Sequence, residues 1–200
     1  YIMTFVSNIK QINVEPTTVC QAECPMCTRT LMGYHNNDIE NKTLTIDQFK
    51  ELVLPLLPLD KISFCGTLGD PLACNDLYYM IDWATCVDDD VTIGINTNGA
   101  LGTVKLWKDI ATLLKDNIYS YVVFSIDGLD DTNHLYRKKV NWSKVMRNAK
   151  AYIKAGGIAH WDMIVFEHNK HQIAEARIIA KDMGFTVFRT KQSSRIDRRD

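Results

Sequence analysis

The 200-residue sequence has no hydrophobic run long enough for a membrane span, which needs about 20 apolar residues in succession. It has no excess of either charge, since 23 lysines and arginines face 24 aspartates and glutamates, so neither a polyanion-binding surface nor a nucleic-acid partner is indicated. It has no internal repeat and no low-complexity tract, and 46% of its residues are hydrophobic, which excludes wholesale disorder and collagen-like chains. We expect a globular chain.

The N-terminus also lacks the basic and then apolar layout of a secretory signal peptide. We therefore expect a cytoplasmic, reducing compartment, in which clustered cysteines bind metal or do redox chemistry more often than they form disulfides. Three of the six cysteines lie close together in the sequence, at Cys20, Cys24 and Cys27. The other three form a scattered set, at Cys65, Cys74 and Cys86. We expect the scattered set to be buried structural thiols.

Short β-rich runs alternate with helix-like segments along the chain. Strands are expected at residues 9–14, 61–65, 91–95, 121–126, 158–166 and 186–189. Helices are expected at 45–57, 76–87, 104–115, 142–155 and 171–183. Thr45 and Gln48 form a capping box for the first helix. Such alternation favours a parallel sheet with helical crossovers. Because a closed eight-stranded barrel takes about 250 residues, we predict an α/β fold with a partial (β/α)6 barrel; a doubly wound open sheet is the alternative.

In either fold, ligands bind at the carboxyl ends of the strands. The loop after the first strand holds Cys20, Cys24 and Cys27 in a C-x3-C-x2-C pattern. Thiolates are soft ligands that select zinc, copper(I) or iron–sulfur clusters. Because the loop supplies only three, one coordination position is left for water, substrate or cofactor. The alternative is a zinc site whose fourth ligand comes from elsewhere, such as His35 or Cys65.

This cysteine pattern resembles the signature of the radical S-adenosylmethionine (SAM) superfamily. The resemblance implies that Cys20, Cys24 and Cys27 hold a [4Fe-4S] cluster whose remaining iron binds SAM through its amino and carboxylate groups. It also implies reductive cleavage of SAM to methionine and a 5'-deoxyadenosyl radical, which abstracts hydrogen from a substrate. A flavodoxin- or ferredoxin-like protein would donate the single electron. Met26 stands where the family usually has an aromatic residue near the adenine.

The segment after the second strand, Leu68-Gly69-Asp70-Pro71, is similar to the G-G-E-P motif, whose backbone receives the SAM ammonium group in the family. Leucine replaces the first glycine and aspartate replaces the glutamate. The third strand ends in Asn96-Thr97-Asn98-Gly99, similar to family members in which this turn faces SAM or substrate. The resemblance therefore assigns cofactor contacts to both loops.

The fourth strand leads into Ser125, Asp127 and Arg137, which resemble the S-x-D-G and H-x-x-x-R pattern of SPASM and sulfatase-maturing enzymes. The resemblance implies that Ser125 bonds SAM and that Arg137 pairs with its carboxylate. Asp127 would bind a hydroxyl or order the loop. Val165, at the end of the fifth strand, would flank the adenine.

Three further features lie near the end of the sequence. His168 and His171 are expected to be surface or helix-cap residues rather than a metal pair, and Asn169 is a natural helix N-cap. The segment 191–195 follows the last strand and would face the mouth of the site, where it could contact substrate. No residue that donates or accepts substrate hydrogen is identified.

We expect residues 1–200 to form a single radical SAM core domain, with 191–200 as a basic tail. Its motifs are closest in style to enzymes that modify peptides or proteins, so we expect such a substrate. No cysteine-rich extension of the SPASM type follows, so we expect either a piece of a longer protein or a minimal enzyme. The alternative function is a non-enzymatic zinc-binding or protein-interaction module.

Overall fold

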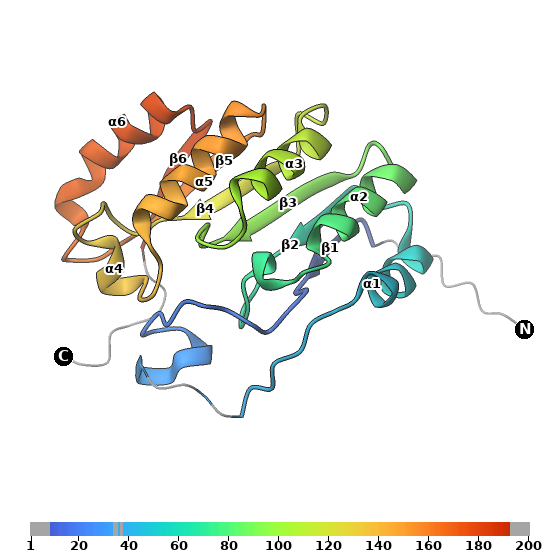
Figure 1. Ribbon diagram of the computed structural model, residues 1–200, viewed down its shortest axis with the longest axis horizontal. Coiled ribbons are helices and arrows are strands. Elements are labelled where there is room, and N and C mark those ends of the chain that lie inside the picture. Colours follow the sequence, from blue (N-terminus) through green and yellow to red (C-terminus); the bar gives the residue numbers. More distant parts are fainter. Residues whose placement is uncertain (1–8, 34–35, 37, 193–200) are drawn as a thin grey trace, which may run out of the picture.

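The computed structural model of the protein describes residues 9–33, 36 and 38–192 (Figure 1). Its strands are β1 (Gln11–Val14), β2 (Lys61–Phe64), β3 (Thr92–Thr97), β4 (Tyr121–Ser125), β5 (Ala159–Val165) and β6 (Val187–Gln192). Its α-helices are α1 (Ile46–Val53), α2 (Leu77–Val87), α3 (Val104–Leu114), α4 (Asn133–Tyr136), α5 (Trp142–Lys154) and α6 (Ile173–Met183). Its short 3-10 helices are η1 (Thr28–Gly33), η2 (Leu54–Leu56), η3 (Pro71–Ala73) and η4 (Lys170–Gln172). The part of the basic tail from residue 193 on, and His35, lie outside the described residues.

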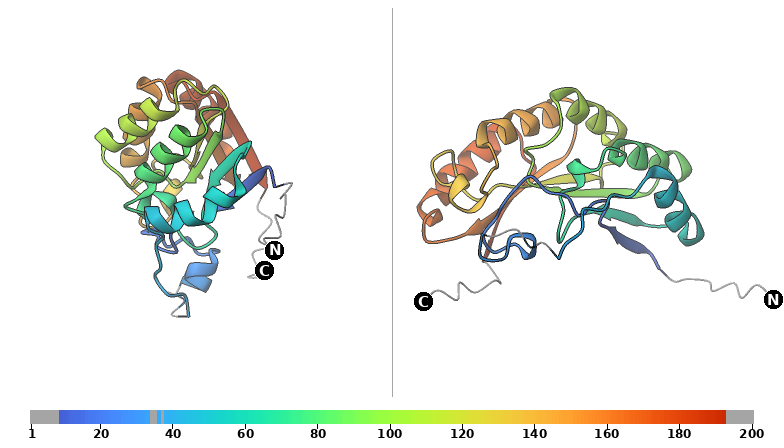
Figure 2. Two further views of the ribbon diagram at one scale, coloured as in Figure 1. Left: turned by 90° about the vertical axis from the view of Figure 1, so that its right-hand side faces the viewer. Right: turned by 60° about the horizontal axis from the view of Figure 1, so that its bottom comes forward.

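The six strands form one parallel sheet in the order β1-β2-β3-β4-β5-β6. A doubly wound sheet would reverse its strand order at a switch point, and this sheet does not. The sheet curves, and its helices lie along its outer side (Figure 2). This is the predicted partial barrel, an open α/β fold. In the described part of the chain, no helix has the length and apolar character needed to cross a membrane.

The two faces of the sheet differ in chemistry. Toward the helices, apolar side chains lie in register on neighbouring strands: Ile95 pairs with Val122, and Phe124 with Trp161. All four are fully buried. The opposite, concave face carries polar side chains from the intervening positions: Lys61, Ser63, Asn96, Tyr121, Ser125, His160 and Asp162. This polarity leaves the concave face suited to polar ligands.

The predicted capping box at the start of α1 is confirmed. Gln48 N donates to the Thr45 hydroxyl at 3.2 Å, and Thr45 N donates to Gln48 Oε1 at 3.0 Å. The predicted end of this helix at residue 57 was wrong, because α1 ends at Val53 and continues as η2. Pro55 lacks the N–H that a further α-helical turn requires.

The core is centred on aromatic side chains between the sheet and the helices. Trp107 of α3 is fully buried, with its ring centroid 5.1 Å from that of Phe124 and 6.0 Å from that of Tyr152. Its indole N–H donates to the Leu101 carbonyl at 2.9 Å. This contact ties the loop after β3 to the core, so packing here helps to position the carboxyl end of the sheet.

Replacing this indole should cost stability. We expect Trp107→Ala to lower the free energy of unfolding by about 3–5 kcal/mol, because it leaves a cavity among aromatic rings. Urea denaturation measures the loss. Tyr119→Ala is the control: its side chain is 71% exposed, so the change should stay within about 0.5 kcal/mol. Equal losses in the two variants would contradict this description of the core.

Candidate functional site

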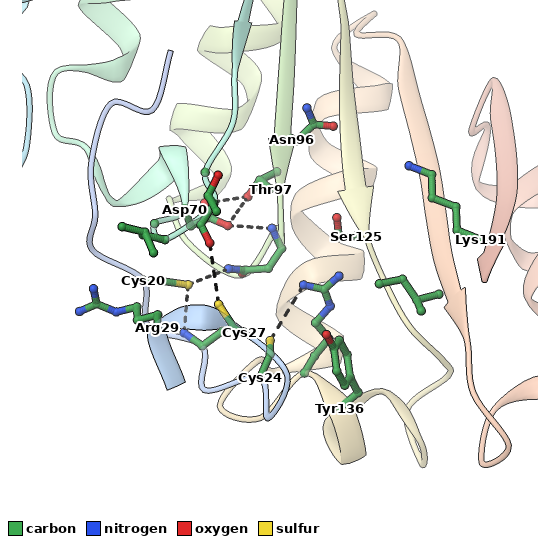
Figure 3. Close-up of a pocket in the computed structure, with 18 of the residues that line it drawn as sticks. Cys20, Cys24, Cys27, Arg29, Asp70, Asn96, Thr97, Ser125, Tyr136 and Lys191 are labelled. Carbon is green, nitrogen blue, oxygen red and sulfur yellow. Dashed lines mark hydrogen bonds between the residues drawn. The ribbon is translucent and has the colours of Figure 1, made fainter. Parts of the chain in front are cut away.

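A cavity of about 360 Å³ lies at the carboxyl end of the sheet. Most of the residues singled out from the sequence line it: Cys20, Cys24, Cys27, Leu68, Gly69, Asp70, Asn96, Thr97, Asn98, Ser125 and Arg137. Met26, Asp127 and Val165 are not among its lining residues. Figure 3 shows that the lining comes from several loops and strand ends, with the cysteine loop on one side and β4 and β6 on the other. The topology therefore gathers motifs that lie far apart in the sequence.

The cysteine loop is folded by its own hydrogen bonds. Cys27 N donates to the Cys24 carbonyl at 3.0 Å, and the Thr30 hydroxyl donates to the same carbonyl at 2.5 Å. Thr30 N bonds the Cys27 carbonyl at 2.9 Å, at the start of η1. Glu23 N donates to the Lys138 carbonyl at 3.0 Å and so fastens the loop to the segment after α4. These bonds hold all three thiols at the cavity (Figure 3).

Each thiol has a different neighbour. Cys20 Sγ accepts hydrogen bonds from Ala22 N at 3.4 Å and Asn98 Nδ2 at 3.7 Å. Cys24 Sγ lies 4.0 Å from Arg137 Nη1, which donates to it, and Cys27 Sγ donates to the Thr67 carbonyl at 3.9 Å.

Burial and the nearby Asp70 carboxylate raise the pKa of Cys20 to about 12. Burial also raises the pKa of Cys24, while Arg137 opposes this shift. The protein environment therefore favours the neutral thiols, and a bound cation would be needed to draw them into the thiolate form.

The donor set fits an iron–sulfur cluster. Three soft sulfur ligands from one loop face a cavity that other loops partly enclose. Within the described ranges, no three Cys, His, Asp or Glu side chains are grouped closely enough to hold one metal ion. Because each thiolate of a cubane cluster binds a different iron, such a cluster does not need three ligands gathered around one ion. A tetrahedral zinc site does need its ligands around a single ion.

Asp70 joins three loops. Its carboxylate accepts hydrogen bonds from the Thr97 hydroxyl at 2.9 and 3.0 Å, from Asn98 N at 2.8 Å and from Leu72 N at 3.0 Å. Its own backbone N–H donates to the Val19 carbonyl at 2.9 Å. Burial raises the pKa of this carboxyl, although the bonds from Asn98 and Thr97 act against the shift. The carboxylate therefore fixes the loop after β3 to the loop after β2, and the backbone N–H of Asp70 fixes the latter to the loop after β1.

Arg137 is held by a buried carboxylate. Its Nε donates to Asp127 Oδ2 at 2.6 Å, and Asp127 Oδ1 accepts from Ile164 N at 2.6 Å. Burial acts to lower the pKa of the guanidinium, but the charges of Asp127 and Cys24 outweigh burial and raise it. Arg137 therefore stays cationic at the cavity wall, and the fully buried Asp127 orders the loop.

Asn169 occupies the N-cap position of η4, as predicted, but its side chain makes no capping hydrogen bond there. Instead, its Nδ2 donates to the carbonyls of Asp127 at 2.8 Å and Ile164 at 2.9 Å. An amide at this position therefore supports the loop of Asp127. His168 stacks on Phe166 at 5.2 Å, and His171 is exposed in η4.

The scattered cysteines are not all buried. Cys74 is buried and donates to the Leu44 carbonyl at 3.6 Å, as expected of a structural thiol. Cys65 is half-buried, and Cys86 is exposed on α2, so the prediction of burial was wrong for Cys86. All six cysteines are free thiols.

Several residues in or beside the cavity were not predicted from the sequence. Glu15, directly after β1, accepts hydrogen bonds from Leu68 N at 2.6 Å and Gly69 N at 3.1 Å. Arg29, Tyr136 and Ile164 line the cavity. Tyr136 and Ile164 directly precede residues that the motifs did identify, whereas no local pattern marks Glu15 or Arg29.

The far wall of the cavity is formed by β6. Lys191 and Gln192 line it, as expected, but they are the last two residues of β6 and do not follow the strand as predicted. Asp162 of β5 accepts from Arg189 Nε at 2.6 Å and from Lys191 Nζ at 2.5 Å. Because one buried carboxylate serves two half-exposed cations, this wall carries a net positive charge.

A partial (β/α)6 barrel with three cysteine thiols at the carboxyl end of its sheet defines a class of iron–sulfur enzymes. The sequence profile of the Radical SAM superfamily matches residues 14–176, and the chain belongs to that superfamily. Membership makes it an enzyme chain with a [4Fe-4S] cluster and SAM as cofactors. A search of curated proteins found no match.

Solved structures share the fold. Streptococcus suis SuiB bound to S-adenosylmethionine superposes with a TM-score of 0.72 at 17% identity, over 95% of this chain and 42% of that one. SuiB bound to the precursor peptide SuiA superposes with a TM-score of 0.73 at 16% identity, over 93% of this chain and 40% of that one. AnSMEcpe with bound AdoMet superposes with a TM-score of 0.70 at 18% identity, over 91% of this chain and 49% of that one. The chain thus spans less than half the length of these structures.

The close approach of two loops at Gly69 can be tested. A Cβ added at this residue would lie 1.8 Å from the Thr17 carbonyl oxygen, so the backbone would have to move. We expect Gly69→Ala to lower the free energy of unfolding by about 1–3 kcal/mol, measured by urea denaturation.

Gly94→Ala in β3 is the matched control. Its added Cβ would have its nearest neighbour at 3.5 Å, an ordinary contact, so we expect no loss. An unchanged stability of Gly69→Ala would show that the loops do not pack as described.

Proposed function

We propose that this chain is the catalytic core of a radical SAM enzyme in which Cys20, Cys24 and Cys27 hold the [4Fe-4S] cluster. When bound, the cluster and SAM supply reductive cleavage of SAM to methionine and a 5'-deoxyadenosyl radical, which abstracts hydrogen from a substrate. The observation that carries the proposal is the placement of these three thiols at one cavity, at the carboxyl end of the sheet. We further propose that residues 1–200 form one core domain.

Arg137 is proposed to bind the carboxylate of SAM. Asp127 holds its Nε, while the rest of the guanidinium reaches the cavity wall beside Cys24. A cation held in place loses less side-chain entropy when it pairs with an anion, and the bond is charge-assisted. Ser125 lines the same cavity and offers a hydroxyl to the same ligand. Asp127 acts through Arg137 and does not touch the ligand.

The segment at Leu68 and Gly69 is proposed to receive the SAM ammonium group. The backbone N–H groups of both residues donate to the Glu15 carboxylate. Their partial positive charges are therefore already compensated and do not oppose the binding of a cation. The Glu15 carboxylate also places negative charge behind the segment. Acceptor groups and a nearby anion together favour an ammonium ligand.

The remaining predicted contact residues differ in whether their side chains are free to reach a ligand in the cavity. Asn96 lies on the concave face, lines the cavity and is exposed, so it can contact SAM or substrate. The Thr97 hydroxyl is occupied by Asp70 and by Gly99 N at 2.9 Å, so its role is to shape the turn. Ile164 lines the cavity, and we assign to it the adenine-flanking role first given to Val165.

We propose a peptide or protein substrate. SuiB has been solved with its precursor peptide SuiA, and anSMEcpe with the Cp18Cys peptide, and both structures share this fold. The polar concave face and the charged wall of Asp162, Arg189 and Lys191 give a peptide many hydrogen-bonding partners. A flavodoxin- or ferredoxin-like electron donor and a cytoplasmic location complete the proposal. A reducing compartment would keep the three cluster thiols from forming disulfides.

Cluster loading tests the ligand assignment. Protein reconstituted anaerobically with iron and sulfide should be brown, bleach with dithionite, and contain iron and sulfide in the ratio of a [4Fe-4S] cluster. Cys24→Ala should lose most of this content, because one of only three thiolates is removed. Cys86→Ala, which changes an exposed thiol remote from the cavity, should load like the unaltered protein. Colourless protein that binds zinc instead would support the non-enzymatic module.

The reaction is tested separately with SAM. Anaerobic incubation of the loaded protein with SAM and dithionite should yield 5'-deoxyadenosine, measured by liquid chromatography. Cys86→Ala should yield the same amount, whereas Cys24→Ala should yield none above the blank without protein. Full SAM cleavage by Cys24→Ala would refute the assignment of the cluster ligands.

A further inference from the structure

The side chain of Asn98 reaches from the loop after β3 into the cysteine loop. The residue is 5% exposed. Its Oδ1 accepts hydrogen bonds from Gln21 Nε2 at 2.7 Å and from Ala100 N at 3.0 Å. Its Nδ2 lies 3.7 Å from Cys20 Sγ and 3.4 Å from Gln21 Oε1. The amide is therefore engaged with the cysteine loop as well as with its own turn.

The neighbours of Asn98 decide which end of its amide faces the sulfur. The backbone N–H of Ala100 can only donate, so the atom that it meets must be the amide oxygen. The NH₂ group then has to point the other way, toward Cys20. Flipping the amide would place two donors against each other and remove both bonds to the oxygen. The N–H···S contact is thus fixed by the local hydrogen bonding.

The backbone of Asn98 is fixed as well. Its N–H donates to Asp70 Oδ2 at 2.8 Å, and the same carboxylate binds the Thr97 hydroxyl. This turn therefore holds the Asn98 side chain against the cysteine loop. In contrast, Asn96 is exposed on the concave face.

We propose that Asn98 is a positioning residue of the cluster, which donates an N–H···S hydrogen bond to Cys20 and thereby raises the reduction potential of the bound cluster. This inference rests on the proposed function, because it requires Cys20 to be a ligand. A ligating Cys20 is a thiolate, which can only accept hydrogen bonds. Two donors already point at its sulfur, Ala22 N and Asn98 Nδ2.

The direction of the effect follows from charge. Reduction adds one electron, supplied by the external donor, and no covalent bond of the chain forms or breaks. The added negative charge spreads onto the sulfur ligands, so a donor hydrogen bond stabilises the reduced state more than the oxidised state. Removing the donor should therefore make reduction harder.

The test compares two pairs of variants in loaded, SAM-free protein. Asn98→Asp keeps an oxygen for Ala100 and Gln21 but loses the NH₂ donor, and Asn98→Ala removes the donor without adding charge. Asn96→Asp and Asn96→Ala make the same chemical changes at the other asparagine of the cavity wall. The readout is the midpoint potential of the cluster, from a redox titration followed by electron paramagnetic resonance.

We expect both Asn98 variants to disfavour reduction by about tenfold, which is about 59 mV for a one-electron couple. The neutral Asn96→Ala should retain the potential of the unaltered protein. Asn96→Asp reports the effect of added charge alone and should shift the potential less than Asn98→Asp. Loaded Asn98→Ala with an unaltered midpoint potential would overturn the inference.

A second measurement does not depend on the Asn98 variants folding. In protein labelled with ¹⁵N-asparagine, pulsed electron paramagnetic resonance of the reduced cluster should detect ¹⁵N coupling, and labelled Asn96→Ala should keep it. Absence of coupling in the labelled Asn96→Ala protein would overturn the inference while leaving the proposed function standing. Failure of the unaltered protein to load iron and sulfide would instead refute the proposed function, and this inference with it.

Discussion

The hydrogen bonds of the Asp70 carboxylate are the contact on which the geometry of the site depends. They join the loop after β2 to Thr97 and Asn98 in the loop after β3. The backbone of Asp70 is bonded in turn to Val19, beside the first cysteine. Burying this carboxylate is unfavourable, as the raised pKa of Asp70 shows, and the donors around it offset that cost. The position of the cysteine loop is therefore set by loops that carry no metal ligand.

The open sheet explains why a polar site can occupy the inside of a barrel-like fold. In a closed eight-stranded barrel, inward side chains pack against one another in apolar layers. Here six strands curve without closing, and helices cover only the outer face (Figure 2). The inward positions of Lys61, Asn96 and Ser125 therefore retain polar side chains that solvent or a ligand can reach. The apolar face packs against the helices and stabilises the fold, while the polar concave face is left for ligand binding.

Sequence patterns predicted the features that are local. The strands, the capping box at Thr45 and the cysteine loop each depend on residues close together in the chain. The sequence did not reveal which distant side chains meet, such as Glu15 with the amides after β2, or Asn98 with Cys20. The role of the Asn169 side chain was missed for the same reason: the residue occupies a helix N-cap position, but its amide binds the Asp127 carbonyl, 42 residues away. Long-range pairing depends on strand order and register, which periodicity does not encode.

Arg189 and Lys191 of β6 affect whether two copies of the chain can pair through the edges of their sheets. In the described part of the chain, β6 pairs with β5 on one side, so its other side presents the hydrogen-bonding edge of a strand. Such edges recruit strands from other molecules and lead to aggregation unless charges oppose the approach. Arg189 and Lys191 place like charges along this edge, and sharing Asp162 leaves them net positive. Mutual repulsion between two copies should thus keep the half-barrel accessible, and high ionic strength should weaken that protection.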